Sequence, residues 1–155
     1  NKVDVREPFV RKLISNNPNI IFDIYGYKKK QPIWSNDFYD ALYKSKMALN
    51  LSRINNVKYY SSNRIASLIG NGILTFVDVN TKLNHFFNND EVIFYKNLDD
   101  LSSKIKYYKK NHTLRNKIAK NGKKRYFDIF NNKIIAQYIC SRLFNIKIKN
   151  LSWMK

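Results

Sequence analysis

The sequence predicts a single α/β domain over residues 1–155, with an open parallel sheet, helices on both faces and a helical C-terminal end. Three observations carry this prediction. Short apolar runs alternate with helical patterns in the first part of the chain, only helical patterns follow, and 44% hydrophobic residues supply a core. A chain of 155 residues also fits one domain better than two.

Four apolar runs are bounded by polar or turn residues and have the length of strands. They cover residues 20–25, 47–51, 73–77 and 92–95. Their β-branched and aromatic side chains favour strands, and their near-continuous apolarity predicts that both faces of the sheet are covered. Helical patterns between strands favour parallel pairing with right-handed crossovers, which is a Rossmann-like arrangement.

Apolar residues at helical spacing precede each of the first three runs. These helices run through Val10, Leu13 and Ile14, through Phe38, Leu42 and Tyr43, and through Ile65, Leu68 and Ile69. From Leu98 onward the pattern is helical only. The stripes there are Leu101, Ile105 and Tyr108, then Leu114, Ile118, Tyr126 and Phe127, then Ile134, Ile135, Tyr138, Ile139 and Leu143. Asp99 and Asp100 suit the first turn of the first of these helices, and Thr113 suits the N-cap of the second.

The charge is strongly basic, with 29 Lys and Arg against 11 Asp and Glu, a net charge of +18. Such a charge is typical of nucleic-acid binders, but it would equally suit a diphosphate ligand or an anionic membrane. Abundant Lys, Asn, Ile, Tyr and Phe with 4 Gly and 3 Pro is also what an AT-rich coding genome produces. A nucleic-acid partner would be held by residues 28–30 and 104–155. We do not expect one, because Tyr107, Tyr108 and Tyr126 have the spacing of core residues rather than of a stacking platform.

Several classes of protein are excluded or disfavoured. No apolar stretch reaches 18 residues, so neither a membrane span nor a signal peptide is predicted. We expect a cytoplasmic protein, and the charge leaves open a peripheral association with the inner membrane face. Cys140 lies on an apolar helical pattern and is predicted to be buried and inert. His85 and His112 are predicted on the surface, and no metal site is expected.

The segment after the second apolar run is the candidate site. Arg53, Lys58 and Tyr60 lie in a loop, and the residues Ser61, Ser62, Asn63 and Arg64 begin the next helix. Ligands of open parallel sheets bind at the carboxyl ends of the strands, where a helix start offers free N–H groups. The pattern therefore indicates a phosphate or diphosphate pocket. The alternative is an ordinary helix cap with Arg64 paired to an acid.

Five motifs in order resemble the C-terminal, donor-binding half of GT-B glycosyltransferases, of the CgeB-like "glycosyl transferases group 1" type. They are the strand at 47–52, RIAS at 64–67 with the turn at 70–72, NDEVIFY at 89–95, DLSSKIKY at 100–107 and RNKIAKNG at 115–122. The resemblance covers residues 18–144. It implies a nucleoside-diphosphate sugar as donor substrate, no further cofactor and no bound metal. It also implies a separate N-terminal domain with the acceptor site, absent from this chain, so the fragment alone is expected to be inactive.

The resemblance adds residues to the site. The helix beginning near Arg64 ends at Gly72, and Gly26 and Tyr27, just past the first apolar run, would face the nucleotide base. A strand-end turn is the alternative for these two. The family carries a Glu three residues after the Arg, to hold the ribose, where this sequence has Ser67. Serine can still hydrogen-bond a hydroxyl, but without charge assistance. A degenerate domain that binds nucleotide without catalysis therefore stays open, beside a basic nucleic-acid-binding module.

Overall fold

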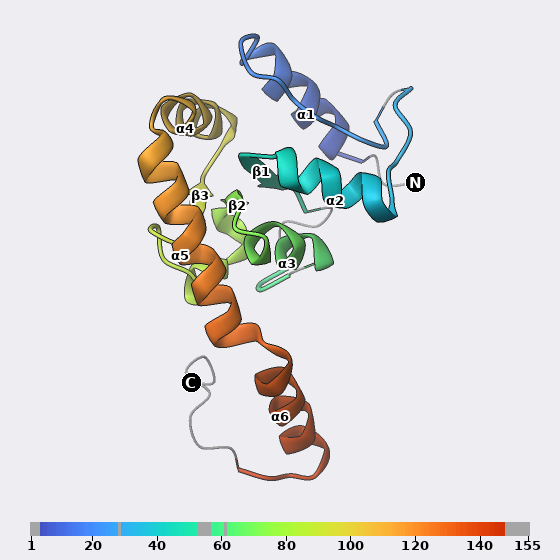
Figure 1. Ribbon diagram of the computed structural model, residues 1–155, viewed down its shortest axis with the longest axis vertical. Coiled ribbons are helices and arrows are strands. Elements are labelled where there is room, and N and C mark those ends of the chain that lie inside the picture. The colour runs from blue at the N-terminus through green and yellow to red at the C-terminus, as the bar shows by residue number, and fades with distance from the viewer. Residues whose placement is uncertain (1–3, 28, 53–56, 61, 148–155) are drawn as a thin grey trace.

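A computed structural model describes residues 4–27, 29–52, 57–60 and 62–147 and shows an α/β domain (Figure 1). Its elements are α1 (Arg6–Ser15), α2 (Ser35–Lys44), β1 (Met47–Asn50), α3 (Asn63–Gly70), β2 (Leu74–Asp78), the 3-10 turns η1 (Val79–Thr81) and η2 (Leu83–His85), β3 (Ile93–Tyr95), α4 (Leu98–Lys110), α5 (His112–Phe130) and α6 (Asn132–Leu143). From residue 35 onward the predicted order of helices and strands, ending in helices alone, is confirmed.

The strands form one sheet in the order β1-β2-β3, and both pairs are parallel. Met47 pairs with Leu74, and Phe76 pairs with Ile93. Three of the four predicted runs are therefore strands, each within one or two residues of its predicted bounds, and the parallel pairing is confirmed. The helix α3 makes the crossover between β1 and β2, as the alternating pattern indicates.

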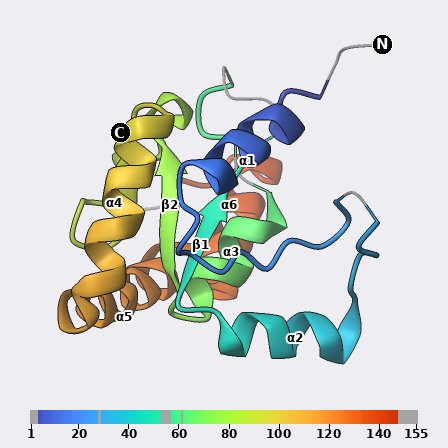
Figure 2. The same cartoon turned by 90° about the horizontal axis from the view of Figure 1, so that it is seen from above.

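Helices cover both faces of the sheet, because neighbouring residues of β2 point to opposite sides (Figure 2). Phe76 packs with Leu13 of α1 and Leu101 of α4. Val77, the next residue, packs with Ile65 of α3. All five residues of β2 are buried, as expected for the central strand of a covered sheet. The Rossmann-like, doubly covered open sheet is therefore present.

The first apolar run, residues 20–25, is not a strand, and this prediction is wrong. Ile20 and Phe22 pack partly against the core, whereas Ile21 between them is 93% exposed. The run therefore buries one side only and forms no ladder with β1. Apolarity shows that a segment needs cover, but hydrogen-bonded pairing also requires its backbone to lie alongside a strand edge.

The start of α4 is as predicted, and the start of α5 is not. Asp99 and Asp100 lie in the first turn of α4, and the Asn97 side chain caps it by accepting from the Asp100 N–H at 2.9 Å. The predicted cap of α5, Thr113, is wrong, because α5 already begins at His112. Asn111 alone separates the two helices, and its side-chain amide donates to the Tyr107 carbonyl at 2.8 Å. One residue thus ends α4 and opens α5.

The last helix, α6, lies beyond the sheet at the far end of α5 (Figure 1). Cys140 on this helix is exposed, so the prediction of a buried thiol is wrong. Ile139 and Leu143 beside it are also 50% and 72% exposed. An apolar stripe predicts burial only where another element lies against it, and the described chain places none over this side of α6.

Candidate functional site

The carboxyl ends of the three strands lie at the same edge of the parallel sheet, and each ends in a polar side chain. Asn50 ends β1, Asp78 ends β2 and Tyr95 ends β3. All three are buried, with 1%, 8% and 2% of their surface exposed. Polar side chains are rarely buried to this extent, and ligands of open parallel sheets bind at the carboxyl ends of the strands. This edge is therefore the candidate ligand site.

Asp78 and Tyr95 are register partners on adjacent strands, so their side chains share one face of the sheet. Asp78 accepts from the Asn80 N–H at 2.8 Å, which fixes the turn after β2. Burial, together with the negative charge of Asp78, raises the pKa of the Tyr95 phenol. The phenol therefore stays protonated and can donate a hydrogen bond. Its oxygen has no hydrogen-bond partner among the described residues.

Asn50 lies on the opposite face of the sheet, beneath α3. Its register partner Val77 packs with Ile65 and Ile69 of α3, which places the Asn50 side chain on the same side. Neither atom of its amide has a hydrogen-bond partner within the described part of the chain. A buried amide without a partner costs about 1–3 kcal/mol. A ligand that reached this amide would remove that cost.

The first turn of α3 lies in the crossover that follows β1, and its Arg64 bonds to Leu51, the residue after Asn50. Ser62 occupies the N-cap position with extended backbone, but no side chain among the described residues caps the helix. The Ile65 N–H donates to the Ser62 carbonyl at 3.0 Å, whereas the N–H groups of Asn63 and Arg64 have no partner within the described residues and are available to an anion. The sequence predicts this feature at Ser62 and Asn63, and the structure places it beside the end of β1.

Arg64 in that first turn is exposed and connects α3 to the end of β1. Its Nη1 donates to the main-chain carbonyl of Leu51 at 2.7 Å. Within the described residues it pairs with no acid, so the alternative of an Arg64 ion pair is not observed. One nitrogen holds the carbonyl, and the rest of the guanidinium remains available at the same edge of the sheet.

The loop at 57–60 also lies at this edge. The Tyr59 N–H donates to the Thr81 carbonyl at 2.8 Å, and the Thr81 hydroxyl donates to the Asp78 carbonyl at 2.6 Å. Lys58 is exposed, with its ammonium 4.7 Å from the Tyr59 ring centre, and Tyr60 is half-buried. Two other predicted site residues, Arg53 and Ser61, lie outside the described residues.

Four predicted site residues lie away from this cluster. Gly72, with φ of 72°, turns the chain from α3 into the amino end of β2, at the opposite edge of the sheet. Ser67 is one turn further along α3 than Arg64, and its hydroxyl donates to the Asn63 carbonyl at 3.1 Å. Gly26 and Tyr27 belong to a turn in the loop between α1 and α2, where Tyr27 forms an isolated antiparallel bridge with Lys30.

The sequence analysis did not identify Asn50 as a site residue, although it lies within the apolar run at 47–51. The signal was present, since an amide interrupts the apolar run at 47–51. A polar residue at the end of a buried strand takes its hydrogen-bond partner either from another part of the fold or from a ligand. Sequence alone could not tell which, because the partners would come from distant elements.

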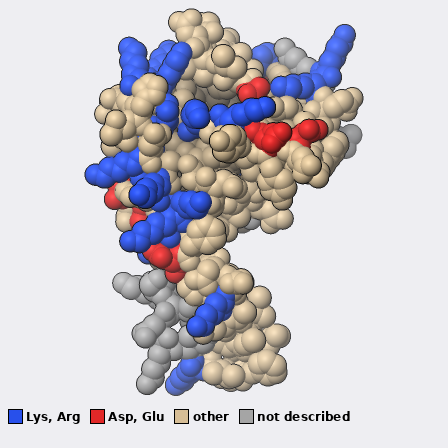
Figure 3. All heavy atoms as spheres, viewed as in Figure 1, with Lys and Arg blue, Asp and Glu red and all other residues tan. Residues whose placement is uncertain are grey.

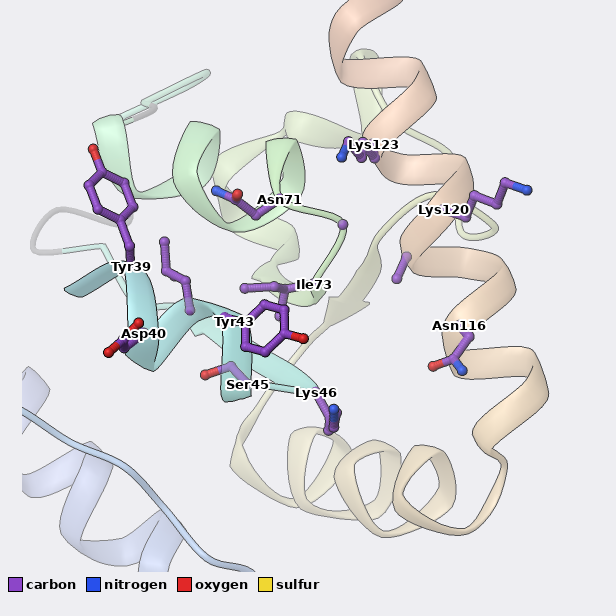
Figure 4. A pocket seen from close by; sticks show the side chains of 13 residues that line it. Tyr39, Asp40, Tyr43, Ser45, Lys46, Asn71, Ile73, Asn116, Lys120 and Lys123 are labelled. Carbon is purple, nitrogen blue, oxygen red and sulfur yellow. The ribbon is translucent and has the colours of Figure 1, made fainter. Parts of the chain in front are cut away.

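A pocket of about 730 Å³, called here the amino-end pocket, lies at the other edge of the sheet (Figure 4). Its walls are α2, the turn from α3 to β2, and α5, so Gly72 lines this pocket instead of the predicted site. Lys46, Lys120 and Lys123 surround it together with the exposed rings of Tyr39 and Tyr43. The pocket and the polar strand ends thus lie at opposite edges. The strand ends hold the buried polar groups, and the pocket wall is open and lysine-rich.

The basic residues are unevenly distributed, and they gather over α4 and α5 (Figure 3). Tyr107 on α4 is 51% exposed, which is contrary to the predicted core position. Tyr108 and Tyr126 are partly buried as predicted, and burial raises the pKa of both phenols. Histidines 85 and 112 are exposed as predicted. In the ranges that the structure describes, no three potential metal ligands come together, and no helix is long and apolar enough to cross a membrane.

Comparison with known proteins gives the family. A search of curated proteins and a search of solved structures found no match. The family model described as glycosyl transferase-like matches residues 6–141, from the first residue of α1 into α6. The match includes all three strands, the uncapped start of α3 and the buried polar strand ends. The chain therefore belongs to the glycosyl transferase-like family.

Proposed function

We propose that this chain is the donor-binding, C-terminal domain of a GT-B, CgeB-like glycosyltransferase, and that it binds a nucleoside-diphosphate sugar at the carboxyl edge of its sheet. The observation that carries the proposal is the buried amide of Asn50, which has no partner in the described chain and lies beneath the uncapped helix α3. Membership of the glycosyl transferase-like family supports a sugar nucleotide as the ligand.

The chemistry of this edge suits a diphosphate. The free N–H groups at the start of α3 and the exposed guanidinium of Arg64 would bind its oxygens, and Lys58 would add charge. During transfer the leaving diphosphate gains negative charge, and donors already in place stabilise it without rearrangement. The Tyr95 phenol, held protonated, would be a further donor on the other face of the sheet.

The acceptor site and any catalytic base belong to a second domain in this proposal. We therefore expect the chain alone to bind nucleoside diphosphate without transferring sugar. Ser67 spends its hydroxyl on the Asn63 carbonyl in this structure. The Ser67 oxygen can still accept a hydrogen bond from a ribose hydroxyl, but without the negative charge of a carboxylate. This favours weak ribose binding and keeps open a domain that binds without catalysis.

A substitution at Asn50 tests the proposal. Asn50→Ala removes an amide that makes no hydrogen bond in the described chain, but it also leaves a cavity at a buried position. Because these two effects oppose each other, we expect the free energy of unfolding to change by less than about 1 kcal/mol. Binding of the best ligand among UDP, GDP, dTDP and ADP should weaken about tenfold in a calorimetric titration, since each 1.4 kcal/mol is a factor of ten.

Asn17→Ala is the matched control. Asn17 is also 1% exposed, but its amide donates to the Leu13 carbonyl at 2.8 Å and to the Ser102 hydroxyl at 3.0 Å. Its loss should cost about 2 kcal/mol of stability and leave the dissociation constant unchanged. If none of the four nucleotides binds, or if both variants change affinity equally, the proposed site is wrong.

A further inference from the structure

The outer side of α5 carries lysines that the proposed donor site does not use. We define the basic face as Lys46, which precedes β1, Lys110 at the end of α4, and Lys117, Lys120, Lys123 and Lys124 on α5. All six are exposed, and none makes an ion pair or hydrogen bond within the described part of the chain. Three other basic residues of these helices are engaged: Lys104 binds Asp100, Lys109 binds the Asn19 carbonyl and Arg125 binds the Phe86 carbonyl.

Two depressions lie along this face, and both are lined in part by residues of α5. Lys46, Lys120 and Lys123 line the amino-end pocket (Figure 4). Lys110 and Lys117 line a depression of about 460 Å³ at the corner between α4 and α5. Asp40 is the one acid among the described residues that line the two depressions. Each depression can therefore hold an anionic group between unpaired ammonium groups.

Apolar and aromatic side chains are exposed among these lysines. Tyr43, on the rim of the amino-end pocket, is 88% exposed. Leu114, in the corner depression, is 37% exposed, and Tyr107 on the last turn of α4 is 51% exposed. Tyrosine and leucine side chains interspersed with lysines are typical of surfaces that lie at the headgroup level of a bilayer.

We infer that the basic face docks the domain on an anionic membrane surface, with lipid headgroup phosphates in the two depressions. The charge complementarity is direct, because six unpaired lysines meet a negatively charged leaflet. Duplex nucleic acid fits less well. Its recognition usually inserts a protruding helix into a groove, whereas these lysines are spread over the start of β1, the corner of α4 and the side of α5. This inference is independent of the proposed donor site.

Sedimentation with vesicles tests the inference. The chain should bind vesicles of two parts phosphatidylcholine to one part phosphatidylglycerol, should not bind pure phosphatidylcholine, and should be released by high salt because exposed charges are screened. The triple variant Lys117→Gln, Lys120→Gln, Lys124→Gln should lower the partition coefficient about a hundredfold, since each lysine near the surface contributes roughly fivefold.

A matched variant controls for net charge. Lys12→Gln, Lys29→Gln, Lys133→Gln removes the same three charges from exposed lysines on α1, the α1–α2 loop and α6. It should lower the partition coefficient by no more than about fivefold. Equal losses from the two triple variants would show that only total charge matters, and would overturn the basic face as a docking surface.

The substitution Tyr43→Ser distinguishes binding to a membrane from binding to a nucleic acid. The ring is exposed, so the melting temperature should not change, but vesicle binding should weaken while binding to duplex DNA stays the same. DNA binding at physiological salt should remain in the non-specific range of roughly 10⁻⁴–10⁻⁶ M. Tighter binding to DNA than to the anionic vesicles, or a Tyr43→Ser variant that binds vesicles like the wild type, would contradict the inference.

Discussion

The carboxyl edge of the sheet and the basic face of α5 both offer polar groups to a partner, but they hold these groups in different ways. At the edge, Asn50 and Tyr95 are buried at fixed positions on strands, and each has an atom without a partner in the described chain. On the basic face the lysines are exposed, and their long side chains are free to move. Buried groups select a ligand by geometry, whereas exposed charges attract any surface of opposite sign.

The energetic consequences differ in the same way. A buried amide without a partner is a cost that a suitable ligand removes, so one substitution should change affinity strongly. Exposed lysines contribute small and nearly additive amounts, so several must be removed together before binding is lost. The comparison therefore predicts single-residue effects at the edge and cumulative effects on the basic face.

The largest expected difference is in the free energy of unfolding, between a substitution on the inner side of α5 and one on its outer side. A side chain at Gly122 would overlap the main-chain carbonyl of Glu91, where α5 touches the segment before β3. Gly122→Ala should lower the free energy of unfolding by about 3 kcal/mol, because backbone must shift to make room. Lys123→Ala, one residue on and exposed, should change it by less than about 0.5 kcal/mol in the same denaturant titration. Similar values for the two variants would mean that α5 does not pack on the sheet as described.

Arg64 tests the comparison of the two regions further, because it is exposed like the lysines of the basic face but lies at the carboxyl edge of the sheet. Arg64→Ala should weaken nucleoside diphosphate binding about ten- to a hundredfold, because a charge-assisted hydrogen bond contributes roughly 1.5–3 kcal/mol. Binding of the nucleoside without phosphates should hardly change. Loss of the bond to the Leu51 carbonyl should lower the stability by about 1 kcal/mol.

Arg125→Ala is the matched control for Arg64. Arg125 also donates to a main-chain carbonyl, that of Phe86 at 3.0 Å, but it lies on α5, where its Nε is also 3.9 Å from a carboxylate oxygen of Glu91. It should lose similar stability and keep full nucleotide affinity. Titrating nucleotide and nucleoside against both variants distinguishes the roles. Equal losses for the two ligands, or no loss for either, would remove Arg64 from the site.

The smallest expected effect is that of a substitution at Asp100, which tests how much one ion pair contributes to the stability of the fold. Burial raises the pKa of this carboxyl, but the Lys104 ammonium and the Lys96 N–H, both at 2.9 Å, outweigh it and leave the pKa below its ordinary value. The pair therefore stabilises the fold fully above the ordinary pKa, and this stabilisation is lost as pH falls through the lowered one. Asp100→Asn should lower the melting temperature by about 2 °C at neutral pH, and the difference should vanish at strongly acid pH. A difference that persists in acid would contradict this assignment.

Part of the site followed from local patterns. The helix start near Ser62 and Asn63 and the position of Arg64 beside a strand end were predicted, because a strand, a turn and a helix that follow one another along the chain fix their own geometry. The side-chain cap that the serine and asparagine residues indicate is not seen at Ser62 among the described residues. Gly72 was grouped with them, but α3 separates it from the edge by the whole length of the helix. Asn50 was missed, because its lack of a partner is a property of the elements packed around it.

The sequence by itself determined the order of strands and helices from α2 onward, the parallel sheet and the excess of positive charge, since these depend on periodicity and composition. Only the tertiary structure decided that residues 20–25 cover the core without joining the sheet, that Cys140 is exposed, and that six lysines on one face have no partner in the described chain. The physical reason is that a local pattern states what a segment needs to bury or to pair. Whether that need is met depends on which distant segments lie against it.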